Sequence, residues 1–106
     1  MTAQLLNLLA QLKDGLSDIY GERLRGVYLY GSHARGTPDR ESDVDVLIVL
    51  DEVESYGAEI RRTSKLVSSV SLENDVSISR AFASVDRWVH DQSMFFVNAR
   101  EDAIPA

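Results

Sequence analysis

The chain has 106 residues and a net charge of −6, so it is long enough for one folded domain, which we expect to span residues 1–106. Eleven basic residues scattered among seventeen acids argue against direct binding to a nucleic-acid backbone, which needs clustered Lys and Arg. The absence of cysteine excludes disulfides, and no apolar run reaches membrane-spanning length. Because the first residues also lack a basic leader, we expect a cytoplasmic protein.

The first predicted elements are an amphipathic helix and a short strand. The apolar residues of the helix recur at spacings of three and four and share one face: Leu5, Leu9, Leu12, Leu16 and Ile19. We expect this face to pack on the domain's own sheet. The strand at residues 27–30 places Tyr28 and Tyr30 on the face opposite Val27 and Leu29. The two tyrosines indicate a second covered surface, through core packing, base stacking or a partner.

A glycine-serine turn follows this strand. Gly31 has no Cβ, so the backbone can turn sharply there and a ligand can approach closely. We expect residues 32–35 to form a short helix whose free N–H groups, with the Ser32 hydroxyl, face outward and bind phosphate. His33 lies within this helix and is expected to be a solvated surface residue.

After a polar loop over residues 36–42, Asp43 and Asp45 open the next predicted strand, residues 44–50. Residues at i and i+2 of a strand share a face, so both carboxylates project together. Two such carboxylates repel each other unless they hold a cation, and Mg²⁺ prefers oxygen ligands, so the pair predicts a magnesium site. Arg35 has two open roles: contact with substrate phosphates, or an ion pair with a nearby acid such as Asp43 or Asp45.

A second long helix is predicted from apolar residues that alternate with charged ones: Val53, Tyr56, Ile60, Val67 and Val70. Its charged side, which includes Glu59, should be solvated. Residues 71–75 form a polar connection, and residues 76–79 alternate as a strand with Ser77 and Ser79 on one face. Ser84 then caps a last helix that is expected to run to residue 99 and to bury three aromatic side chains: Trp88, Phe95 and Phe96.

The combination of G-S-x-A-R-G with a later S-D-x-D and an aliphatic run resembles the signature of the DNA polymerase β-like nucleotidyltransferase superfamily. The resemblance is closest to the minimal nucleotidyltransferases (MNT), which pair with HEPN-domain proteins, and it covers nearly the whole chain. It implies an α/β (α+β) fold with a small mixed sheet and helices mainly on one face. Expected catalytic and metal-binding residues are Asp43, Asp45 and Asp75, with Glu73 as a weaker candidate for the third place. Expected nucleotide-binding residues are Gly31, Ser32 and Arg35.

The resemblance also implies two Mg²⁺ ions, ATP as the nucleotide substrate, and transfer of AMP to a tyrosine of a HEPN ribonuclease toxin, with the chain acting as its antitoxin. Two alternatives stay open: an antitoxin that neutralises its partner by contact alone, and a small-molecule nucleotidyltransferase of the antibiotic-modifying type. A Walker phosphate-binding loop is excluded because no G-x-x-x-x-G-K-[ST] occurs. Without the family, Asp75 would be read as ordinary turn chemistry before a strand.

Overall fold

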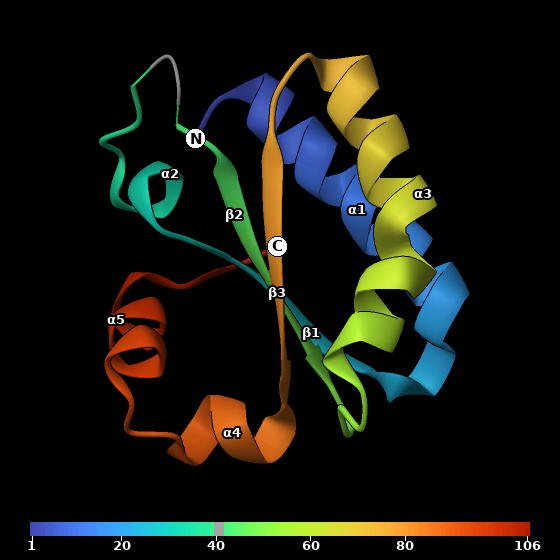
Figure 1. Ribbon diagram of the computed structural model, residues 1–106. Helices are drawn as coiled ribbons and strands as arrows, with labels where there is room; N and C mark the ends of the chain where they lie inside the picture. Colours follow the sequence, from blue (N-terminus) through green and yellow to red (C-terminus); the bar gives the residue numbers. More distant parts are fainter. Residues whose placement is uncertain (40–41) are drawn as a thin grey trace.

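The computed structural model describes residues 1–39 and 42–106, so part of the predicted loop over residues 36–42 lies outside the described residues. A four-stranded sheet has the order β3-β2-β1-β4 (Figure 1). Strand β2 pairs antiparallel with β1 and parallel with β3, so the sheet is mixed, as predicted. The elements in chain order are α1 (Ala3–Tyr20), η1 (Gly21–Arg23), β1 (Leu24–Tyr30), α2 (Ser32–Arg35), β2 (Val44–Leu50), α3 (Tyr56–Asn74), β3 (Ile78–Ser84), α4 (Val85–His90), α5 (Met94–Asp102) and β4 (Ile104–Pro105).

Helices cover both faces of the sheet, with the two long ones together on one side (Figure 1). Helices α1 and α3 enclose the larger core, in which Leu16 and Leu29 are completely buried. The shorter α4 and α5 lie over the other face, where Leu47 and Phe96 are buried. Tyr28 and Tyr30 face this smaller core, so the second covered surface predicted from them is confirmed.

Helix α3 and strand β3 differ from their predicted bounds. The expected polar connection at residues 71–75 is wrong, because α3 continues to Asn74, whose buried side-chain amide donates to the Val70 carbonyl at 2.8 Å and to Gln11 Oε1 at 3.1 Å. Asp75 follows as the C-cap with φ 52°, in the left-handed region. Strand β3 therefore starts at Ile78 and extends to Ser84, beyond the predicted end at residue 79.

The predicted last helix is two helices, α4 and α5. Ser84 caps α4 as expected, its Oγ accepting from the Arg87 N–H at 3.2 Å. The chain then breaks after His90, where Asp91 accepts the Ser93 N–H at 2.8 Å. The break changes which aromatic side chains are buried: Phe96 is buried and Trp88 half-buried, but Phe95 is 45% exposed, contrary to prediction.

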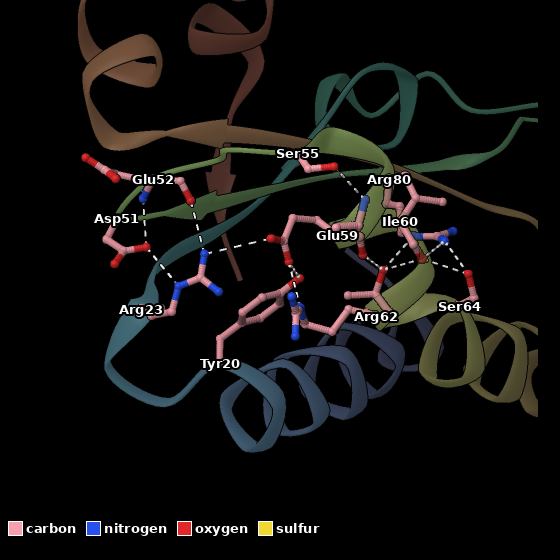
Figure 2. Close-up of polar contacts among 12 residues, drawn as sticks. Tyr20, Arg23, Asp51, Glu52, Ser55, Glu59, Ile60, Arg62, Ser64 and Arg80 are labelled. Carbon is pink, nitrogen blue, oxygen red and sulfur yellow. Dashed lines mark hydrogen bonds and ion pairs between the residues drawn. The ribbon is translucent and has the colours of Figure 1, made fainter.

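Glu59 is buried rather than solvated, with only 4% of its surface exposed. Figure 2 shows the reason: its carboxylate accepts from the Tyr20 hydroxyl at 2.7 Å and from Arg62 Nε at 3.0 Å. Arg23 Nη2 lies 3.8 Å from the same carboxylate, and its Nε donates to Asp51 at 3.1 Å. A buried charge needs such partners, and here they join α3 to the end of α1 and the end of β2.

Candidate active site

The glycine-serine turn and the acid pair lie against each other because β1 and β2 are neighbouring antiparallel strands. Tyr30, the last residue of β1, pairs with Asp45 in the register. Gly31 follows with φ 76° and ψ −155°, a conformation that is essentially limited to glycine. A Cβ at Gly31 would overlap Asp45 Oδ2 and lie 3.2 Å from its Cγ. Glycine is thus required here both by the turn and by the carboxylate packed on it.

Asp43 is close enough to Asp45 to affect the ionisation of Asp45. The pKa of Asp45 is raised above its ordinary value, first by burial and then by the negative charge of Asp43. His33 and Arg35 act in the opposite direction but do not cancel the shift. Two oxygen-donor groups with uncompensated negative charge fit a hard divalent cation such as Mg²⁺, and Asp43 and Asp45 would hold it.

Helix α2 is a single turn, as predicted, and it is tied to the other end of the chain. Arg35 Nη1 donates to Asp102 Oδ2 at 2.7 Å, which links α2 to α5. Arg35 therefore has an acidic partner, as one of its two expected roles requires, but that partner is Asp102 rather than Asp43 or Asp45. The Arg35 side chain is still 52% exposed, so the ion pair does not bury the guanidinium.

His33 is half-buried, not solvated as expected, and its Nε2 lies 3.3 Å from the Ser42 carbonyl. It lines a cavity of about 480 Å³ together with Leu5, Leu8 and Val44. These apolar residues belong to the core beneath α1, so the cavity lies on the sheet face opposite the acids. The cavity therefore opens on the other side of β2 from the acid pair, with His33 at its edge.

Asp75 does not join the acid pair. Its backbone N–H bonds to the Leu72 and Ser71 carbonyls at the end of α3, and its exposed side chain lies at a hollow formed with Ser71, Val76 and Ser77. Within residues 1–39 and 42–106, no group of three or more His, Cys, Asp or Glu is placed to hold a metal ion. The expected cluster of Asp43, Asp45 and Asp75 is thus not assembled.

Tyr30 and Phe95 form an aromatic pair beside the acids, and the sequence points to each residue separately but not to their contact. Tyr30 meets Phe95 edge to face, with ring centroids 5.7 Å apart. Burial raises the pKa of Tyr30 to about 12, and the charge of Asp45 adds to the effect. The alternation of β1 predicts the face that Tyr30 occupies, but its contact with Phe95, 65 positions later, depends on the break between α4 and α5.

The sequence model of the family described as "Nucleotidyltransferase domain" matches residues 9–98, most of the chain and both parts of the site. The chain belongs to this family. It is 38% identical over 76 residues to the protein named "Putative protein adenylyltransferase MJ0141" of Methanocaldococcus jannaschii, a match covering 72% of this chain and 76% of that protein. The homology makes it a nucleotidyltransferase and a relative of that protein.

A solved structure shares the fold. This nucleotidyltransferase superposes on a chain in a crystal structure of a mutant MntA–HpeT toxin–antitoxin with a TM-score of 0.58, covering 93% of this chain and 68% of that one. The sequence identity is 14%, so this likeness shows a shared fold alone, and together with the family match the fold is that of the polymerase β-like nucleotidyltransferases. None of the helices described here is long and apolar enough to cross a membrane.

Proposed function

We propose that this nucleotidyltransferase is a Mg²⁺-dependent protein adenylyltransferase that transfers AMP from ATP to a tyrosine of a HEPN-domain toxin and so acts as its antitoxin. The observation that carries the proposal is the packing of Gly31 against Asp45. It sets a phosphate-binding turn directly beside a pair of acids able to hold a divalent cation. The family and the adenylyltransferase relative support the same chemistry.

In this reaction the acceptor hydroxyl oxygen forms a bond to the α-phosphorus of ATP, the bond to pyrophosphate breaks, and the hydroxyl proton is released. A bound Mg²⁺ would neutralise charge on the phosphates. Asp43 and Asp45 would hold it, while Gly31 and Ser32 bring backbone N–H groups close to the phosphates. The half-exposed Arg35 guanidinium adds a positive charge whose effect reaches Asp45.

A protein acceptor fits this chain better than a small molecule. A transferase must hold its acceptor in line with the α-phosphate, which needs a surface that positions it. The acids lie on the sheet face opposite the 480 Å³ cavity, and Asp43 is exposed. A folded partner can supply its own interface and present one hydroxyl to such an open site.

The test is to incubate a purified HEPN partner with this protein, ATP and Mg²⁺, and to measure the intact mass of the partner. We expect a mass increase of one AMP, which is lost when Asp43→Asn and Asp45→Asn are combined. A matched control carries Asp14→Asn and Asp18→Asn, which remove the same charge from the exposed side of α1 and should leave transfer unchanged.

The second candidate, neutralisation by contact alone, is favoured by one observation: Asp75 stands apart from the acid pair. If the partner is neutralised by both the wild type and the Asp43→Asn, Asp45→Asn variant, with no mass increase in either sample, the adenylyltransferase proposal is rejected. Contact inhibition then takes its place.

A further inference from the structure

Strand β3 lies directly beside the strand that carries the acids. The parallel register pairs Asp45 with Ser79, and the Val44 N–H donates to the Ser77 carbonyl at 2.9 Å. Ser79 is therefore the β3 neighbour of Asp45. Continuing the register by one residue, Ser77 just before β3 lies beside Asp43 just before β2. Because paired residues in adjacent strands point to the same side, both serines share the face of the acids.

The rest of β3 confirms which way these side chains point. Ala81 and Ala83, the next residues of the same parity, pack with Leu47 and Val49 in the smaller core. Arg80 points to the opposite face, where it donates to Thr63 Oγ1 at 2.9 Å and to the Ile60 carbonyl at 2.8 Å (Figure 2). Ser77 and Ser79 are both exposed.

Asp75 cannot replace these serines without a change in the fold. Its left-handed conformation and its two N–H contacts to the Leu72 and Ser71 carbonyls end α3. The Ser71 hydroxyl donates to the Val76 carbonyl and fixes the next residue as well. Moving Asp75 onto the acid face would break this cap, so β3 offers hydroxyl groups where a third carboxylate would stand.

The protein ligands of the site then bear on how many ions it holds. Asp43 and Asp45 together carry the charge that balances one divalent cation. A two-ion centre places its metals about 3.5 to 4 Å apart, and each ion needs oxygen ligands of its own. A neutral serine hydroxyl adds no charge to hold a second ion, so that ion would have to share Asp43 and Asp45 with the first and would gain no anionic protein ligand of its own from the residues that the structure describes.

We infer that Asp43 and Asp45 form a one-ion site, with Ser77 and Ser79 in place of the carboxylate that would complete a two-ion centre. This inference rests on the proposed function and deepens it, because the same site then binds the metal–nucleotide complex well and transfers AMP slowly. An acidic residue at position 77 or 79 supplies the missing ligand. It also supplies a base for the acceptor proton.

The test counts bound Mn²⁺ by electron paramagnetic resonance, with the full chain saturated by a non-hydrolysable ATP analogue. We expect one ion in the wild type, none when Asp43→Asn and Asp45→Asn are combined, and two in Ser77→Asp or Ser79→Asp. The matched controls Ser77→Asn and Ser79→Asn have a similar side-chain volume without the charge and should keep one ion. Because both serines are exposed, the variants should keep the wild-type melting temperature, which is measured first.

A second readout is the initial rate of AMP transfer to the HEPN partner. The aspartate variant that gains an ion should be at least about tenfold faster than the wild type, since a positioned base contributes roughly 10² to 10⁴ in rate. Two ions in the wild type, or one ion in both aspartate variants, would overturn the inference. Absence of transfer in every variant rejects the proposed function instead, and the ion count is unaffected by that result.

Discussion

Replacing Gly31 by alanine tests whether the turn and the acid pair are one unit. The φ of 76° with ψ of −155° costs a non-glycine residue about 1 to 3 kcal/mol. The new Cβ would also overlap Asp45 Oδ2, so the carboxylate must move. We expect Gly31→Ala to lower the free energy of unfolding by at least the backbone cost, measured by urea denaturation. The melting temperature should fall by about 4 °C for each kcal/mol lost.

The control is Gly21→Ala. Gly21 also has a positive φ, 56°, but a Cβ there meets no atom within 4 Å, so only the backbone cost remains. We expect Gly31→Ala to be more destabilising than Gly21→Ala and to weaken Mg²⁺-dependent ATP binding, which Gly21→Ala should leave unchanged. Calorimetric titration measures the binding.

A double-mutant cycle isolates the overlap itself. Asp45→Ala removes the carboxylate that the new methyl group meets, so it should be less harmful, or more stabilising, in the Gly31→Ala background than in the wild type. Residues in contact couple by about 0.5 to 3 kcal/mol. Equal losses for Gly31→Ala and Gly21→Ala together with an additive cycle would refute the packing argument.

Two further predictions concern stability. The pKa of Glu59 is lowered from its ordinary value of 4.5: burial alone would raise it, but hydrogen bonds from Tyr20 and Arg62 outweigh that effect. The stability that the ionised Glu59 carboxylate contributes is therefore present above about pH 4.5 and is lost as the pH falls through the folded-state pKa. Glu59→Gln should be less stable than the wild type at pH 7, and its free energy of unfolding, measured with urea, should fall less steeply towards acid pH. Leu47→Ala, at a completely buried position, should cost about 2 to 5 kcal/mol in the same assay, and a loss below 1 kcal/mol would contradict the described core.

The sequence predicts the elements whose local pattern and tertiary environment agree. Strand β2 occurs at residues 44–50 as expected, because its aliphatic run is buried on both faces. Helix α1 is also confirmed, but its buried face differs from the predicted set of apolar residues. Leu8 and Tyr20 are buried in addition, whereas Ile19 is 36% exposed. Tyr20 is missed because its burial depends on Glu59, 39 positions away.

The parts that sequence reasoning missed depend on contacts between distant residues. Arg35 pairs with Asp102, 67 positions later, and no local pattern links the two. The Asn-Asp pair predicts a turn followed by a strand at residue 76. Instead, Asn74 belongs to α3, where its amide donates to Gln11 on α1, and the strand starts two residues later, at Ile78. That extension also decides where Asp75 lies. The family signature therefore predicts the acid pair, while tertiary contacts decide the third position.

The edge strand β3 also bears on how the protein behaves at high concentration. One rim of an edge strand is an open template on which another chain can pair and start aggregation. The Tyr56 hydroxyl accepts the Phe82 N–H at 3.4 Å, and its ring packs edge to face on Phe82. A side chain thus occupies part of the rim, so a second strand would have to displace Tyr56 before it could extend the sheet.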